Sequence, residues 1–102
     1  MSPVKKYDVR VCRIERAEQI APGIYDVTVE AGELAKAARP GQFAHIYVPG
    51  KTLRRPISIC ETGSGTLRFV FQDKGEGARI LAASRPGGSW DILAPPGNGF
   101  AL

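Results

Sequence analysis

Apolar and polar residues alternate with a period of two through much of this 102-residue chain, and such alternation predicts β-strands. Gly- and Pro-containing turn segments separate the runs, for example Pro22-Gly23 and Pro49-Gly50. The pattern predicts six strands, over residues 7–14, 24–31, 42–48, 57–60, 66–72 and 89–93. Within the first strand, Val9 and Val11 are expected on one face, which Arg13 would share.

Helical pattern is scarce along the chain. Residues 33–38 allow one helical turn before Pro40-Gly41. Residues 78–83 predict one short helix, which Pro86-Gly87-Gly88 ends. Residues 94–100 are expected to be irregular.

Short strands with little helix predict an all-β domain. A six-stranded closed antiparallel barrel of the Greek-key type, with one short helix at one end, would leave no exposed strand edge. A β-sandwich fits the same pattern. The length indicates a single domain, residues 1–102.

The composition is that of an ordinary globular protein, with 43% hydrophobic and 24% charged residues. No apolar run approaches the ~18–20 residues that cross a membrane, and residues 1–6 lack the apolar core of a signal peptide. Cys12 and Cys60 are far apart and form no CxxC pair. They predict reduced thiols in a cytoplasmic protein, no metal site, and a small core residue at position 60.

The surplus of basic over acidic side chains lies mostly in the second half of the chain. Residues 51–102 carry 7 basic and 4 acidic side chains, against 7 and 6 in residues 1–50. These charges are scattered singly, without interleaved aromatic residues, so nucleic acid is not an expected partner.

The segment Arg54-Arg55-Pro56-Ile57-Ser58-Ile59 is the strongest candidate for a binding site. At ~3.3 Å per residue, the side chains of Arg55 and Ser58 are roughly 10 Å apart, on opposite faces unless Pro56 bends the strand. This spacing suits a ligand with an anionic end and a heteroaromatic end. An ordinary edge strand with solvated arginines is the other interpretation, and Arg54 is expected to face solvent or another domain.

The segment Lys74-Gly75-Glu76-Gly77 leads directly into the late predicted helix. Free N–H groups and the helix dipole at such a start can bind phosphate, and glycines allow close approach. Read alone, the segment also fits a plain turn. Together with Arg55, which would bind phosphate oxygens, and Ser58, which would bind a ring nitrogen, it predicts a diphosphate clamp.

These motifs resemble the ferredoxin–NADP reductase superfamily of flavoproteins. Arg55-Pro56-Ile57-Ser58 is similar to its Arg-x-Tyr/Ile-Ser/Thr motif, and residues 74–78 are similar to its Gly-x-Gly-Thr/Ser segment. Residues 53–59, 86–93 and 95–100 further resemble the branch that contains the electron-transfer subunits of dihydroorotate dehydrogenase, which implies a role in pyrimidine biosynthesis.

The resemblance implies an FAD-binding barrel with its short helix at the phosphate-binding end. Arg55 would bind the FAD phosphate, Ser58 would lie near flavin N5, and Gly77 and Ala78 would donate backbone N–H groups to the pyrophosphate. Ala78 replaces the usual Thr or Ser, which removes a hydroxyl contact worth about 0.5–1.5 kcal/mol. The implied cofactor-binding residues are Arg55, Pro56, Ile57, Ser58, Phe71, Gln72, Asp73, Gly77 and Ala78.

The family's nucleotide-binding α/β domain and, in the dihydroorotate branch, a cysteine-rich segment for a 2Fe–2S cluster are not expected within residues 1–102. The chain is therefore expected to be a fragment or a truncated paralogue that does not complete NAD(P)H turnover alone. No catalytic or metal-ligating residue is predicted. Expected partners are a flavin nucleotide, a catalytic subunit or redox partner protein, and a second copy of the chain.

Two further interpretations stay open at this point. One is a non-catalytic barrel that has lost its cofactor and serves as an interaction module. The other is the flavin domain of a related flavin–iron–sulfur NAD(P)H reductase.

Overall fold

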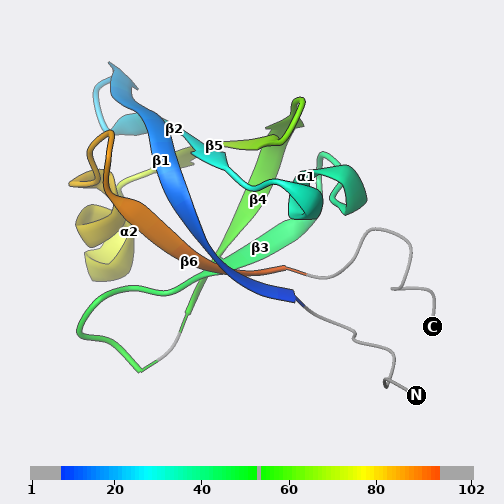
Figure 1. The fold of residues 1–102 in the computed structure, drawn as a ribbon. Helices are drawn as coiled ribbons and strands as arrows, with labels where there is room; N and C mark the ends of the chain where they lie inside the picture. The colour runs from blue at the N-terminus through cyan, green and yellow to red at the C-terminus, as the bar shows by residue number, and fades with distance from the viewer. Residues whose placement is uncertain (1–7, 53, 95–102) are drawn as a thin grey trace.

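The computed structural model describes residues 8–52 and 54–94, and in it six strands close into one barrel (Figure 1). Two short helices lie outside the barrel, on different sides of it in this view. The elements are β1 (Asp8–Ala21), β2 (Ile24–Glu30), α1 (Glu33–Ala37), β3 (Phe43–Ile46), β4 (Arg55–Thr62), β5 (Thr66–Gln72), α2 (Gly75–Ala82) and β6 (Ser89–Ala94).

The strand order around the barrel is β1-β2-β5-β4-β3-β6, and every neighbouring pair is antiparallel. The hairpin-connected strands β3, β4 and β5 are adjacent, and β6 returns to lie beside β3, which is a Greek-key arrangement. The predicted closed antiparallel barrel is therefore confirmed, and the sandwich is not. The single predicted helix becomes two, because the possible turn after Gly32 forms α1.

The predicted strands agree with the structure best where glycine loops bound them. Strand β5 covers residues 66–72 as predicted, whereas β1 continues to Ala21, well past the predicted end at residue 14. Pairing with β2, through Ala21↔Ile24, extends β1 over a polar stretch that alternation alone does not mark as strand. The irregular segment predicted after residue 94 lies outside the described residues.

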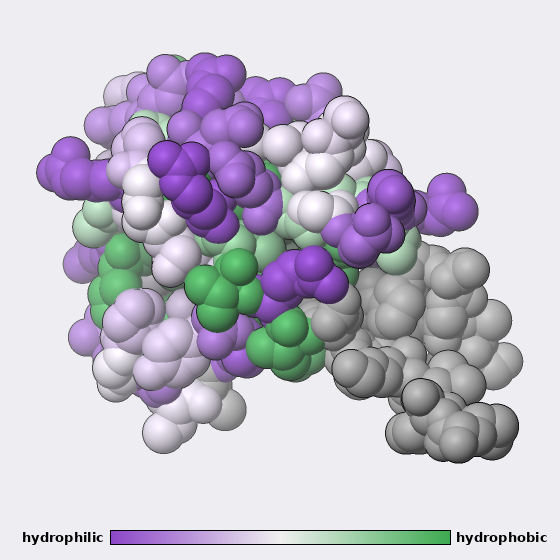
Figure 2. Space-filling view, in the orientation of Figure 1, coloured by the Kyte–Doolittle hydropathy of each residue, from purple (hydrophilic) through white to green (hydrophobic). Residues whose placement is uncertain are grey.

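The expectation that Val9, Val11 and Arg13 share one face of β1 is confirmed, and this face is the outer one. Val9 and Val11 are exposed, while Cys12 and Ile14 are buried. Both faces of this strand carry apolar residues, so alternation alone does not show which face enters the core. The register of pairing decides it, because Ile14 pairs with Val29 on β2 and Cys12 pairs with Trp90 on β6. Figure 2 shows hydrophobic residues in the middle of the face that β1 and β6 form.

An aromatic cluster fills the part of the core nearest α2. The rings of Phe69 and Phe71 contact Trp90, with centroids 5.5 and 6.0 Å away, and Tyr25 stacks on Phe71. The indole Nε1–H of Trp90 donates a 2.7 Å hydrogen bond to the Ser84 hydroxyl, so its one polar group is satisfied inside the protein. Trp90 is buried and belongs to the core.

Strands β3 and β6 form the shortest contact around the barrel, with only two paired residues on each strand. The guanidinium of Arg54 joins the two strands here. It donates hydrogen bonds to the carbonyl oxygens of His45 on β3 (3.2 Å) and Asp91 on β6 (3.0 Å), and it forms an ion pair with the Asp91 carboxylate (3.0 Å). The expectation that Arg54 faces solvent or another domain is therefore wrong, because Arg54 stabilises the closure of the barrel.

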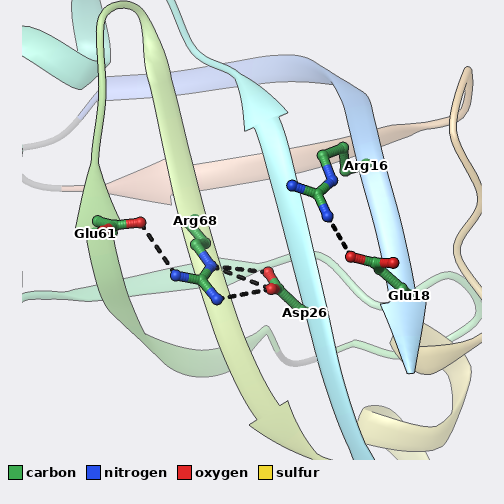
Figure 3. A network of polar contacts seen from close by, with 5 residues as sticks. All are labelled: Arg16, Glu18, Asp26, Glu61 and Arg68. Carbon is green, nitrogen blue, oxygen red and sulfur yellow. Dashed lines mark hydrogen bonds and ion pairs between the residues drawn. The ribbon is translucent and has the colours of Figure 1, made fainter. Parts of the chain in front are cut away.

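A second charged network lies on the outer surface of β2, β5 and β4 (Figure 3). Arg68 on β5 bonds both oxygens of Asp26 and also reaches Glu61, at 2.8–3.2 Å. Hydrogen bonds to Asp26 first, and to Glu61 second, raise the pKa of the Arg68 guanidinium. Asp26 is the one buried charged side chain among the described residues, so Arg68 supplies the counter-charge that its burial requires.

Within residues 8–52 and 54–94, neither helix is long and apolar enough to span a membrane.

We expect Arg68→Ala to lower the midpoint of urea unfolding clearly, because it leaves the Asp26 carboxylate buried without a partner. Arg16→Ala is the matched control, since Arg16 pairs with Glu18 on the exposed surface of β1 (Figure 3) and should change stability by no more than about 0.5 kcal/mol. Urea unfolding of both variants measures the difference. Equal losses would contradict this role for Arg68.

Candidate functional site

Strand β4 separates its apolar and polar residues onto two faces. Ile57 and Ile59 point into the core, which places Pro56, Ser58 and Cys60 on the outside. Cys60 is exposed, so its predicted place in the core is wrong. Because Ile57 and Ile59 point inward, the residues that alternate with them, including Cys60, must point outward. The residue does share the face of Ser58, as its spacing requires.

Arg55 and Ser58 line the same hollow, the Ser58 pocket, although their spacing alone predicts opposite faces. The pocket has a volume of about 260 Å³ and lies between β4, the end of β5 and the start of α2. Phe71 supplies an aromatic wall that rests on Trp90 and the core behind it. The lining residues are Arg55, Pro56, Ile57, Ser58, Val70, Phe71, Gln72, Lys74 and Ala78.

The start of α2 borders this pocket, and no side chain of its N-cap residue caps its backbone N–H groups. Lys74 is the N-cap residue and its side chain makes no capping hydrogen bond, so the first-turn N–H groups have no side-chain acceptor there. Gly75 has a φ of 85°, a conformation that other residues rarely adopt, and nothing crowds its Cα. Ala78 is buried and is the fourth residue of α2, where its N–H can bond the Lys74 carbonyl within the helix. The free first-turn N–H groups are therefore those of the three residues before it.

A second hollow, the Lys51 pocket, adjoins the first and has a volume of about 390 Å³. The loop between β3 and β4 forms one side and the first turn of α2 forms the other. The Lys51 ammonium and the Glu76 carboxylate are 2.6 Å apart across these two elements. Lys51 lowers the pKa of Glu76 below its usual range, through its hydrogen bond first and its charge second. The lining residues are Val48, Lys51, Thr52, Arg54, Arg55, Pro56, Glu76 and Gly77.

The two pockets share Arg55 and Pro56. Within residues 8–52 and 54–94, neither Arg55 nor Lys74 forms an ion pair, so the Ser58 pocket carries two cations without protein counter-charges. An aromatic wall, a hydroxyl and these cations suit a ligand that joins a flat ring to an anionic group. The same described residues contain no cluster of three His, Cys, Asp or Glu side chains that could hold a metal ion.

Most of the residues predicted for the site come together in the structure. Seven of the nine line the Ser58 pocket, and Gly77 lines the Lys51 pocket. Asp73 lines neither; its backbone N–H bonds Gly23, and its carboxylate lies against the same glycine in the β1–β2 turn. The sequence pattern does not mark Val70, Lys74 or Lys51 as site residues. The position of Lys74 directly before the glycine-bracketed helix start was the available signal for one of them.

The chain is similar in sequence to dihydroorotate dehydrogenase B (NAD(+)) electron transfer subunits. It is 44% identical over 90 residues to that of Enterococcus faecalis strain OG1RF, which covers 83% of this chain and 34% of the relative. Identity to the Streptococcus pneumoniae R6 subunit is 36% over 94 residues, covering 88% of this chain and 36% of that one. The chain thus spans about a third of the length of these curated relatives. Comparison with models of protein families gives no match.

Solved structures of two reductases share the fold of this chain. The NADH-dependent reduced ferredoxin-NADP oxidoreductase matches with a TM-score of 0.76 at 28% identity, over 82% of this chain and 32% of that one. A Neisseria gonorrhoeae ferredoxin NADP+ reductase, solved with bound FAD and NADP, matches in fold with a TM-score of 0.64 at 18% identity, over 90% and 37%.

The closed Greek-key barrel and these matches define a β-barrel domain of the ferredoxin–NADP reductase family, and the chain belongs to that family. Its curated relatives reported above are, more particularly, electron transfer subunits of dihydroorotate dehydrogenase B.

The different surroundings of the two adjacent arginines predict different effects of their removal. We expect Arg54→Ala to lower the free energy of unfolding by about 1–3 kcal/mol, because three hydrogen bonds between β3 and β6 are lost. Arg55→Ala, an exposed position, should change it by no more than about 0.5 kcal/mol. Urea denaturation of the two variants side by side measures both values, and a larger loss for Arg55→Ala would contradict the assignment.

Proposed function

We propose that this chain is the FAD-binding domain of an electron-transfer oxidoreductase subunit. The observation that carries the proposal is the joint lining of one pocket by Arg55, Ser58, Phe71 and Ala78, which come from β4, β5 and α2. These positions match the flavin motifs that the sequence predicts. The bound FAD of the Neisseria gonorrhoeae structure supports a flavin on this fold.

Each lining residue has a contribution that follows from its chemistry. Arg55 would neutralise the phosphate, and the free first-turn N–H groups before Ala78, including that of Gly77, would bind its oxygens. Pro56 and Ile57 would bring backbone against the isoalloxazine ring, and the Ser58 hydroxyl would hydrogen-bond the ring near N5. Phe71 and Gln72 would contact the ribityl and adenosine portions, a role that we also assign to Asp73, although Asp73 lines neither pocket.

Flavin supplies hydride and one-electron chemistry when bound, while the protein supplies binding, orientation and electrostatics. In this chain, Arg55 and Lys74 supply positive charge, and the Phe71 wall excludes water from one side of the pocket. No residue is assigned as a nucleophile or general base. A 2Fe–2S cluster and the nicotinamide-binding domain are proposed only for a longer protein that contains this barrel.

The names of the relatives support a proposal about the whole protein. They describe electron transfer subunits of an NAD-dependent dihydroorotate dehydrogenase. We therefore propose that a protein containing this barrel passes electrons between a catalytic subunit and NAD in pyrimidine biosynthesis, in the cytoplasm. A different chain is favoured as partner over a second copy, because the relatives are named as subunits. A related flavin–iron–sulfur reductase is the other parent protein that this barrel fits.

Purified protein titrated with FAD should quench the flavin fluorescence and shift its absorbance. Arg55→Ala should weaken FAD binding about ten- to a hundredfold, because charge-assisted hydrogen bonds worth about 1.5–3 kcal/mol are lost. Fluorescence titration of wild-type and variant proteins measures the dissociation constants.

Arg39→Ala is the control for the loss of one positive charge, because Arg39 is exposed and lines neither pocket. Unchanged affinity in Arg55→Ala would remove Arg55 from the site. A folded wild-type protein without flavin affinity would overturn the proposed function and support an interaction module that has lost its cofactor.

A further inference from the structure

The second half of β1 has a free edge, although the barrel is closed. In the described part of the chain, β1 pairs with β6 only through residues 8–13, and the backbone of Ile14 then bonds the loop before β6. Beyond this point β1 continues to Ala21 with β2 as its neighbour on one side only (Figure 1). No backbone hydrogen bond from a described residue reaches residues 15–20 on the other side. Because the backbone groups of a strand point alternately to its two sides, this edge presents unpaired N–H and C=O groups.

The regular part of the free edge is short and consists of residues 16–19, the β1 edge. The register with β2 shifts on both sides of this segment, between Ile14 and Arg16 and between Gln19 and Ala21. Bulges and charged side chains are common means of keeping an exposed edge from pairing with any strand it meets. The β1 edge can therefore add only a short strand, whose sequence its surroundings select.

A groove of about 300 Å³ lies between the β1 edge and the C-terminal end of α2. Residues 82–85 form the side of the groove opposite the strand. Ala17, Tyr25 and Val27 give it an apolar lining, and all three belong to the core or pack against it. Ala17 pairs with Val27, so the two residues lie on the inner face of the sheet. A strand added to the β1 edge would place every second side chain over this lining, which suits small apolar residues.

The outer side of the β1 edge is acidic. A hollow of about 580 Å³ lies there, and its charged lining consists of four carboxylates and two guanidiniums, from Glu15, Glu18, Asp26, Glu61, Arg16 and Arg68. Arg16 pairs with Glu18, and Arg68 pairs with Asp26 and Glu61 (Figure 3). Among the described residues, Glu15 has no ion-pair partner. Since Glu18 lines both the hollow and the groove, the outward side chains of an added strand would meet an excess of negative charge.

We propose that the β1 edge binds an extended segment of another protein as an added strand, with small apolar side chains over the groove and basic side chains outward. The unpaired backbone groups supply hydrogen bonds, while the apolar lining and the carboxylates select the sequence. A second copy of this chain fits less well, because each copy would bring its own residues 82–85 against a groove of this size. The groove and the Ser58 pocket share no lining residue, so the proposal goes beyond the proposed function and does not depend on flavin.

The probe is a synthetic peptide of about six residues with blocked ends, in which lysine and valine alternate. Titrated into the isotope-labelled full chain, it should bind saturably. The amides of residues 16–19 that point away from β2 should then exchange their hydrogens at least about tenfold more slowly, because the added strand pairs with them. The same peptide with an N-methylated backbone is the control, since it keeps the side chains and loses the N–H donors. It should not bind.

The acidic side of the edge is tested by charge reversal. Glu18→Lys should weaken binding of the lysine–valine peptide about three- to tenfold, because it removes an attraction and adds a repulsion. Glu33→Lys is the matched control and should leave the affinity unchanged. It also breaks an exposed ion pair, with Lys36 on α1, and Glu33 lines neither the groove nor the hollow.

Four results would overturn the proposal. They are the absence of binding by the lysine–valine peptide, equal binding of its N-methylated form, unchanged hydrogen exchange at residues 16–19, and equal weakening by Glu18→Lys and Glu33→Lys. Self-association of the chain that Glu18→Lys abolishes would make a second copy the occupant and would also overturn it. Titration with FAD is independent of all these results, so failure of the β1 edge is distinguishable from failure of the proposed function.

Discussion

Closure of the barrel depends on the short contact between β3 and β6, and Arg54 is the residue that completes it. Two paired residues on each strand provide little backbone hydrogen bonding, and the Arg54 guanidinium adds bonds to carbonyl oxygens of both strands. Because Arg54 is held in this way, its neighbour Arg55 is fixed at the entrance of β4 and faces the pockets. Two adjacent residues of one type thus do different work, one in the fold and one at the site.

The alternation of inward and outward side chains along β4 fixes the position of the next site residue, Ser58. Ile57 and Ile59 enter the core, and Ser58 must therefore face outward, toward the wall that Phe71 provides. The aromatic wall stands on the core itself, since Phe71 contacts Trp90. The candidate site is therefore a direct product of core packing, with α2 adding backbone N–H groups and Lys74.

The sequence predicts this fold well where a single pattern dominates. Strand β5 alternates cleanly between glycine-rich bounds, and its limits are as predicted. Strand β1 shows where pattern reasoning stops, because both of its faces carry apolar residues, and pairing with β2 and β6 chooses Cys12 and Ile14 for the core. The continuation of β1 to Ala21 depends on the same long-range pairing, which local propensity does not contain.

Motif spacing predicts the central residues of the candidate site but not the charged residues around them. Arg55, Ser58 and Ala78 belong to short recognisable segments, and the fold brings them to one pocket. Lys51 comes from a loop whose approach to α2 no local pattern encodes, so only the structure reveals its contact with Glu76. The position of Arg54 differs from the expected one for a similar reason, because its partner Asp91 lies 37 residues away in the sequence.

The position of Trp90 gives the protein a built-in optical reporter. It is the single tryptophan in the chain, and one ring, Phe71, stands between its indole and the Ser58 pocket. Loss of the core exposes this indole to water, whereas a chromophore in the pocket comes close enough to accept its excitation energy. One emission signal therefore reports both the integrity of the barrel and the occupancy of the site.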